Sequence, residues 1–282
     1  MDQLSMSDLD EENKNSAVIR IEETIRAPLY WHSPVDCQIL DLKECHYDEV
    51  LQLIKRHFFA EDPMCRAINI LADSVSTQSY LDFVQLWMKD TTSLVAISSK
   101  SGRVVGTVIT RINSSLDRSN TYSRIQIFQG EAVEKIMQLN NTLIRRADAY
   151  ARLETDVYLR IYILCVHPSY LSRGLKSGLI EAFIEMAITL EIPAIGGIFS
   201  SSDNQKLARD LGFKLLLEIS YSQWSLNGEI IFNNPGSGNY SVAFMAMQTP
   251  SLDYLKNIWQ SREDGINEDK ARQNNHHRFI EY

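Results

Sequence analysis

The sequence has 282 residues, of which 44% are hydrophobic and 23% are charged, and its formal net charge is -8. This length and composition indicate one globular domain with extensions. The acidic balance argues against general binding of polyanions, which needs a basic surface stripe. An acidic protein field would instead raise the local concentration of a cationic small molecule, although many proteins are acidic for solubility alone.

The first residues, MDQLSMSDLDEE, contain no basic segment followed by an apolar one, so we expect no secretory signal. No run of about 18 apolar residues is present, so we expect no membrane span. The cysteines fit neither a disulfide framework nor a zinc pattern; they are Cys37, Cys45, Cys65 and Cys165. We therefore expect reduced thiols, no metal site, a cytoplasmic location, and no nucleic-acid or membrane partner.

The ends of the chain are polar. Residues 1–30 are first acidic and then rich in Ile, Glu and Arg, which predicts a loosely ordered N-terminal extension. The apolar patterns begin after it, so the domain is predicted over 31–250. Residues 251–282 are expected to form a polar C-terminal tail.

Apolar spacing predicts strands and helices in alternation across the domain. In chain order we expect a strand at 37–42, a helix at 44–59 that ends before Pro63, further helix at 64–89, a hairpin of strands at 94–99 and 104–112, a helix at 131–151, a strand at 157–166, a helix at 174–190, a strand at 194–199, a helix at 202–211, and strands at 213–221 and 242–247. The 157–166 segment, VYLRIYILCV, is typical of a central strand buried on both faces. The order is an α/β pattern.

The stretch VHPSYLSRGLKSGLIEAF (166–183) places a short loop between this buried strand and the next helix. A helix N-terminus offers unpaired N–H groups and partial positive charge, which suit a phosphate. A glycine lets the backbone approach the anion closely. The polar candidates are Ser172, Arg173, Lys176 and Ser177, with Gly174 as the close-approach residue. From these residues alone, an ordinary strand–loop–helix unit remains the alternative.

This stretch resembles the acyl-CoA-binding motif of the GNAT superfamily of acyltransferases. Val166, Pro168, Tyr170 and Gly174 match that motif, whereas Leu171 stands where Gln or Arg is usual and Lys176 where Gly or Ala is usual. The resemblance implies the GNAT fold: a mixed, mostly antiparallel twisted sheet of about seven strands, flanked by helices, with splayed central strands. It also implies acetyl-CoA as co-substrate and no metal. The implied binding residues are Leu164, Cys165, Val166, Ser172, Arg173, Gly174, Leu175, Lys176 and Ser177.

Four segments resemble one branch of that superfamily, the insect arylalkylamine N-acetyltransferases. They are HFFAEDPMC (57–65), RRADAYARLETDVYLRIYILCVHPSY (145–170), FSSSDNQKLARDLGF (199–213) and ISYSQWSLNGEIIFNNP (219–235). The resemblance implies direct transfer of an acetyl group to a small primary amine. It implies Asp62 or its neighbour Glu61 as the general base, and Ser200 in proton movement.

Other positions depart from that branch. Asn204 stands where a second serine is usual, Ala208 where a tyrosine acid is found in many GNAT enzymes, and a histidine is missing near Gly238. The alternatives left open are a polyamine acceptor, a longer acyl-CoA donor, acetylation of protein lysines, and an acyl-CoA-binding protein without turnover. Cys165 is expected in the core rather than as a nucleophile. The protein is expected to be a monomer. Several aromatic residues are expected either to line an amine pocket or to lie in the core; they are Tyr47, Phe58, Phe59, Tyr80, Trp87 and Trp224.

Overall fold

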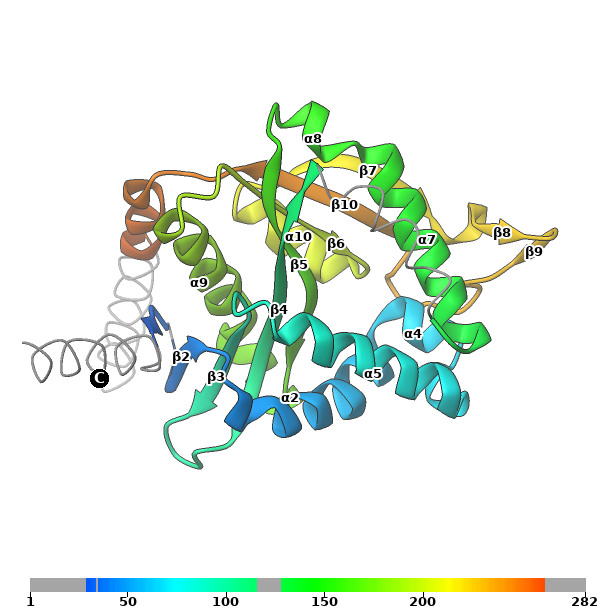
Figure 1. Cartoon of the computed structure of the whole chain (residues 1–282), viewed down its shortest axis with the longest axis horizontal. Coiled ribbons are helices and arrows are strands. Elements are labelled where there is room, and N and C mark those ends of the chain that lie inside the picture. The colour runs from blue at the N-terminus through cyan, green and yellow to red at the C-terminus, as the bar shows by residue number, and fades with distance from the viewer. Residues whose placement is uncertain (1–28, 34, 116–127, 262–282) are drawn as a thin grey trace, which may run out of the picture.

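The computed structural model describes residues 29–33, 35–115 and 128–261. An eight-stranded sheet runs through the molecule (Figure 1). Its strands, in spatial order, are β1 (Tyr30–Trp31), β2 (Cys37–Asp41), β3 (Leu94–Ser98), β4 (Val104–Ser114), β5 (Val157–Val166), β6 (Ala194–Phe199), β10 (Ser241–Gln248) and β7 (Lys214–Ser220). Every neighbouring pair is antiparallel except β5 and β6. The expected mixed, mostly antiparallel sheet is therefore confirmed, with the two-residue β1 as an added edge strand.

Helices cover both faces of this sheet (Figure 1). On one face lie α2 (Tyr47–Leu53), α5 (Ser74–Met88) and α7 (Glu131–Ala147), whose apolar residues share one buried cluster with Ile163 and Cys165 of β5. On the other face lies α9 (Leu175–Thr189), whose apolar residues share a second cluster with Leu164 and Val166. The central strand is thus buried on both sides, as its apolar sequence predicts.

Short elements complete the chain. They are η1 (Glu44–His46), the π-helical turn η2 (Ile54–Phe58), α3 (Phe59–Glu61), α4 (Pro63–Ala67), η3 (Ile70–Ala72), α8 (Ala149–Arg152), η6 (Pro168–Arg173), α10 (Ser202–Asp210), η7 (Tyr221–Gln223), and a small hairpin of β8 (Ser225–Leu226) and β9 (Glu229–Ile230). The predicted helix at 44–59 continues through the π turn to Glu61. Pro63 then begins α4, since the first position of a helix needs no backbone N–H.

The central strands diverge, as the resemblance implied. The parallel register between β5 and β6 covers only three pairs and stops at Ile161. On its other side, β5 carries a bulge: Ile109 and Thr110 of β4 pair with Ile163 and Ile161. Tyr162 is therefore an extra residue in β5, and Ile161 and Ile163 point to opposite faces of the sheet. The bulge turns the second half of β5 away from β6.

The C-terminal segment differs from the expected polar tail. Residues 252–261 are helical, Leu255 on this helix is fully buried, and Ile258 and Trp259 pack against the core beside α9. The Trp259 Nε1 also donates to the Glu181 Oε2 at 2.9 Å. The domain therefore extends to at least residue 261. Residues 262–282 of the expected tail, and 1–28 of the expected extension, lie outside the described residues.

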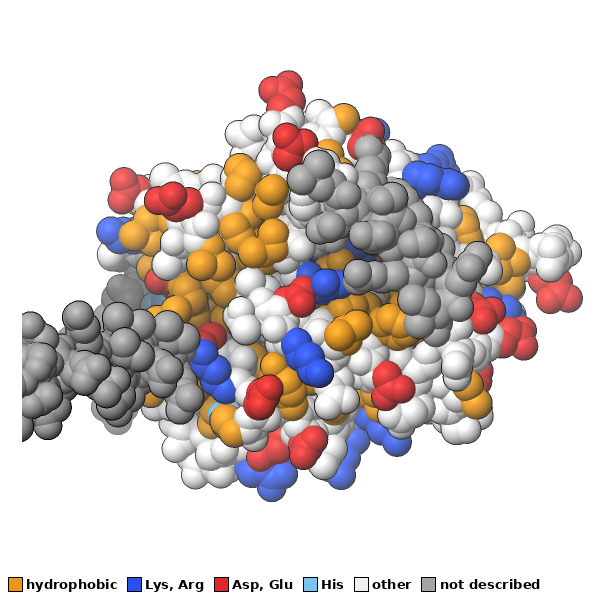
Figure 2. Space-filling view, viewed as in Figure 1, with side chains coloured by type: hydrophobic (Ala, Val, Ile, Leu, Met, Phe, Trp, Pro, Cys, Tyr) orange, Lys and Arg blue, Asp and Glu red, His pale blue; other side chains and the backbone are white. Residues whose placement is uncertain are grey.

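The surface carries mixed charge. On the face shown in Figure 2, acidic and basic side chains lie interspersed, and positive charge is not gathered into a stripe on the described part of that face. No helix in the described segments is long and apolar enough to cross a membrane.

Truncating Leu255 tests whether the C-terminal helix belongs to the domain. Leu255→Ala is expected to lower the free energy of unfolding by about 2–5 kcal/mol, because it leaves a cavity in the core. The matched control is Leu252→Ala on the same helix, where the side chain is 39% exposed and the expected change is within about 0.5 kcal/mol. Urea unfolding followed by tryptophan fluorescence measures both, and equal small effects would contradict the assignment.

Candidate functional site

The divergence of β5 and β6 leaves backbone groups of β5 unpaired by the sheet. The His167 N–H donates to the Val105 carbonyl of β4 at 2.8 Å. Hydrogen-bonded and non-hydrogen-bonded residues alternate along an antiparallel pair. The peptide groups of Val166 and Leu164 consequently point away from β4, toward the side where pairing with β6 has ended. Two N–H and two C=O groups therefore face the gap.

Asp62 lies at this gap, where it is the N-cap residue of α4. Its Oδ1 accepts hydrogen bonds from the backbone N–H groups of Met64 and Cys65, at 3.0 and 3.1 Å. Its Oδ2 accepts a hydrogen bond from the Ser200 hydroxyl, which follows β6. The Ser200 carbonyl in turn accepts from the Tyr221 hydroxyl at 2.6 Å. Residues 138 positions apart in sequence thus form one buried polar group.

Burial controls the protonation of this group. Asp62 is only 8% exposed, and its burial raises the pKa of the carboxyl above the ordinary value. The hydrogen bonds from Ser200, Cys65 and Met64 oppose that shift without overcoming it. Burial likewise raises the pKa of the Tyr221 hydroxyl, which stays protonated and can only donate its hydrogen to Ser200.

Two cavities meet at Asp62 and Ser200. The first, which we call the loop cavity, has a volume of about 280 Å³ and is lined mainly by residues that precede or begin α4, α9 and α10. The second, which we call the aromatic cavity, has a volume of about 190 Å³. Its aromatic lining residues are Phe58, Tyr80, Phe83, Trp87, Phe128, Tyr162 and Phe199. Both cavities are lined by Phe58, Asp62, Leu164, Ser200 and Asn204.

The two acidic candidates lie differently. Asp62 borders both cavities, whereas Glu61 is exposed and borders only the loop cavity. Ser200 is brought against Asp62, as the sequence resemblance required. Gly238, near which a histidine is missing, lies on the wall of the loop cavity.

The loop before α9 ends at Gly174 in a conformation that favours glycine. Gly174 takes a φ of +81°, in the left-handed region, and a side chain built there would meet nothing within 4 Å. Ser172 and Arg173 are exposed beside it, and the Leu175 side chain is fully buried, so only its backbone N–H can face solvent. The first N–H groups of α9 have no partner within the helix.

Two side chains that the sequence assigns to the loop are already engaged. The Lys176 Nζ donates to the Asn204 Oδ1 at 3.2 Å, which ties the loop to α10. The Ser177 hydroxyl donates to the Glu181 Oε1 at 2.7 Å, so it has no hydrogen left for an anion. Ser177 as a side-chain donor is therefore a prediction that the geometry does not favour.

Cys165 contributes backbone only. Its side chain points into the core on the α5 side, where the Sγ donates to the Leu53 carbonyl at 3.7 Å. Burial raises the pKa of this thiol to about 12. A thiol that stays protonated is a poor nucleophile, so the geometry supports a core role for Cys165.

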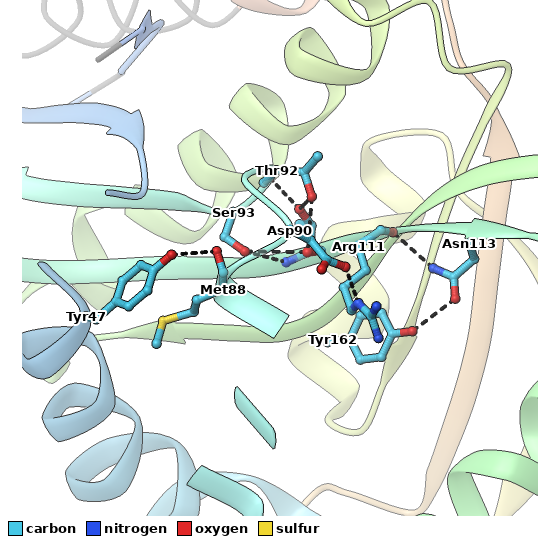
Figure 3. A network of polar contacts seen from close by, with 9 residues as sticks. Tyr47, Met88, Asp90, Thr92, Ser93, Arg111, Asn113 and Tyr162 are labelled. Carbon is cyan, nitrogen blue, oxygen red and sulfur yellow. Dashed lines mark hydrogen bonds and ion pairs between the residues drawn. The ribbon is translucent and has the colours of Figure 1, made fainter. Parts of the chain in front are cut away.

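All the aromatic candidates pack in or against the core, and three of them also line the aromatic cavity. Those three are Phe58, Tyr80 and Trp87, whereas Tyr47, Phe59 and Trp224 line neither cavity. The Tyr47 hydroxyl donates to the Met88 carbonyl at 2.9 Å (Figure 3).

The sequence analysis did not identify two residues of this site, the buried Arg160 and the hydrogen-bond donor Tyr221. Arg160 lines the aromatic cavity and is only 4% exposed. A signal for it was present, since it is the one charged residue within VYLRIYILCV, a strand predicted to be buried on both faces. Tyr221 lies in the segment 219–235 that carries the resemblance, but its role depends on the Ser200 carbonyl, which only the fold brings to it.

No protein-family model matches the chain, and no curated protein matches its sequence. Solved structures do match its fold. Arylalkylamine N-acetyltransferase 2 from Aedes aegypti superposes with a TM-score of 0.69 and 20% identity, over 77% of this chain and 100% of that chain. The polyamine N-acetyltransferase of Drosophila melanogaster, described as forming N-acetylagmatine, gives 0.65 and 16%, over 76% and 100%. The condensation domain of Ebony, solved with beta-alanyl-dopamine, gives 0.57 and 12%, over 75% and 98%. The chain therefore has the GNAT fold that these structures share.

Proposed function

We propose that this protein is an N-acyltransferase that moves an acetyl group from acetyl-CoA directly to the primary amine of a small aromatic acceptor. The observation that carries the proposal is the meeting of two cavities at unpaired peptide groups of β5 and at the buried Asp62–Ser200 pair. The fold it shares with enzymes described as arylalkylamine and polyamine N-acetyltransferases supports it.

The loop cavity is the proposed site of acetyl-CoA. The pyrophosphate of acetyl-CoA would accept hydrogen bonds from the first N–H groups of α9. Arg173 and Lys176 would offset its negative charge, and Gly174 would let the backbone approach it closely. The pantetheine would lie along β5, where Val166 and Leu164 offer peptide groups that β6 leaves unpaired. This arrangement brings the thioester to Asp62 and Ser200.

The chemistry requires loss of a proton from the acceptor. An alkyl ammonium has a pKa near ~10 and becomes nucleophilic only when deprotonated. The Ser200 hydroxyl already donates to Asp62, so it can accept the amine proton while passing its own to the carboxylate. The amine nitrogen then bonds to the thioester carbon, an N–H near Leu164 stabilises the oxyanion, and the C–S bond breaks. The nitrogen loses a second proton as the amide forms, and the released CoA thiolate takes up a proton, so the products are the N-acetyl amide and the CoA thiol.

The aromatic cavity is the proposed acceptor site, and its charges bear on the choice of acceptor. Asp62 is the only carboxylate among the described residues that line it, beside two arginines, Arg111 and Arg160. A polycation would meet like charge there, while aromatic walls suit an aryl group. The lining therefore favours an aromatic amine over a polyamine.

Replacing Asp62 by asparagine tests the base. Asp62→Asn retains an N-cap for α4 but cannot accept a proton, so kcat is expected to fall roughly 100-fold or more while the fold is kept. Glu61→Gln, one position earlier on the exposed side, is the matched control and is expected to stay near the wild-type rate. Thiol release from acetyl-CoA with an aromatic amine measures both, and loss of activity in Glu61→Gln alone would move the base to Glu61.

Titration of Asp62 gives a stability test with a definite sign. Burial raises the pKa of this carboxyl in the folded protein, so the folded state binds the proton more tightly than the unfolded state. Its contribution to stability is fully present below the ordinary pKa of about 4 and is lost as pH rises through the raised value. The Tm of Asp62→Asn relative to wild type is therefore expected to rise between pH 4 and pH 8, as followed by calorimetry. A constant difference would contradict the raised pKa.

Gly174 tests the proposed donor site. Gly174→Ala is expected to cost about 1–2 kcal/mol in loop conformation, because an alanine resists the left-handed region, and to weaken acetyl-CoA binding. Gly174→Asn is the matched variant, since asparagine tolerates that region, and it should bind acetyl-CoA more tightly than Gly174→Ala. Calorimetric titration with acetyl-CoA measures both; equal affinities in wild type and Gly174→Ala would place the donor elsewhere.

A further inference from the structure

Arg160 is the unusual residue of the aromatic cavity. It lies in β5, next to the last residue that pairs with β6, and is only 4% exposed. Its cross-strand neighbour on β4 is another arginine, Arg111. Like charges directly opposite one another destabilise a sheet, so this pair needs compensation from elsewhere.

The other polar side chains with which β4 and β5 line the aromatic cavity have partners. Arg111 forms an ion pair with Asp90, and the Tyr162 hydroxyl donates to the Asn113 Oδ1 at 3.0 Å (Figure 3). The Asn113 amide in turn donates to the Arg111 carbonyl at 3.0 Å. These contacts join β4, β5 and Asp90 at the cavity.

Arg160 has no such partner. Within 29–33, 35–115 and 128–261, no carboxylate pairs with its guanidinium, and its buried Nε has no hydrogen-bond partner. Its contacts are with rings: the guanidinium carbon lies 4.4 Å from the centre of the Tyr162 ring and 6.0 Å from that of Phe244. Aromatic faces attract a cation weakly, but they do not neutralise its charge or accept its hydrogen bonds as a carboxylate would.

A buried cation without a counter-ion is costly, and the described residues that line the cavity do not supply one. Asp62, the only carboxylate among the described lining residues, already accepts hydrogen bonds from the backbone of α4 and from Ser200. Asn140, which lines the cavity from α7, has a buried Oδ1 that also lacks a hydrogen-bond partner. The cavity therefore presents an uncompensated cation among aromatic rings, and a ligand with an anionic group would compensate it.

We propose that Arg160 binds a carboxylate of the acceptor, so that the amine substrate is an aromatic amino acid rather than a simple arylalkylamine or a polyamine. A guanidinium presents paired N–H donors that match the two oxygens of a carboxylate. The aryl group would contact the rings of the cavity, and the amine would face Ser200 and Asp62. The inference rests on the proposed N-acyltransferase function and names its substrate class.

The test compares acceptors that differ only by the carboxylate: tryptophan against tryptamine, and phenylalanine against phenethylamine. The wild-type protein is expected to have a higher kcat/KM for the amino acid of each pair, by thiol release from acetyl-CoA. In Arg160→Met, kcat/KM for the amino acids is expected to fall roughly 10- to 100-fold, as for loss of one charged hydrogen-bonded contact, while the decarboxylated amines are affected little. The preference for the amino acid over the decarboxylated amine should therefore narrow or reverse in Arg160→Met.

A charge-matched control is Arg145→Met, which removes the same charge from an exposed position of α7 and should leave the preference unchanged. Thermal unfolding of Arg160→Met separates binding from a structural role. Because the substitution removes an unpaired buried charge, its Tm is expected to equal or exceed that of wild type. A lower Tm with an equal loss of kcat/KM for both members of each pair would overturn the proposal in favour of a structural arginine.

Binding without donor distinguishes this proposal from the proposed function. If no amine releases thiol, yet tryptophan binds to the wild type and not to Arg160→Met in calorimetric titration, the carboxylate site stands and acyl transfer fails. If tryptamine is acetylated, tryptophan is not, and Arg160→Met changes neither result, acyl transfer stands and the carboxylate site is overturned.

Discussion

The divergence of β5 from β6 is the constraint on which the site depends. Three parallel pairs hold the strands together, and the extra residue Tyr162 then turns β5 aside. In a continuous sheet, the peptide groups of Leu164 and Val166 would bond to β6, and the two cavities would be separated by the sheet. The gap instead leaves those groups free and joins the loop cavity to the aromatic cavity. One irregularity in register thus creates both the binding surface and the passage.

Burial at this junction sets the chemistry on each side. Asp62 is withdrawn from water by the same packing that lets it cap α4, so its proton affinity is raised and its contact with Ser200 is fixed. Arg160 is withdrawn from water as well, but nothing in the described protein neutralises it. A raised-pKa carboxyl and an uncompensated guanidinium in one cavity favour a ligand that brings both an amine and an acid group.

Much of this fold follows from the sequence, because hydrophobic periodicity reports burial directly. The strand at 157–166 has the predicted bounds, and the loop at Gly174 has the conformation that a glycine there indicates. The bulge could not be predicted, since it depends on how β4 pairs with β5. The helix at 252–261 was hidden by its charged neighbours, although Leu252 and Leu255 have helical spacing. The isolation of Arg160 could not be predicted either, because the absence of a partner is a property of the fold.

The most direct test of the account is amide hydrogen exchange, resolved by residue, with and without acetyl-CoA. The amides of Leu164 and Val166 face the gap, whereas those of Ile163 and Cys165 lie on the β4 side of the strand. Acetyl-CoA bound between β5 and β6 is expected to slow exchange at Leu164 and Val166 and to leave exchange at Ile163 and Cys165 unchanged. Unaltered exchange at Leu164 and Val166 under saturating acetyl-CoA would contradict a donor site between the two strands.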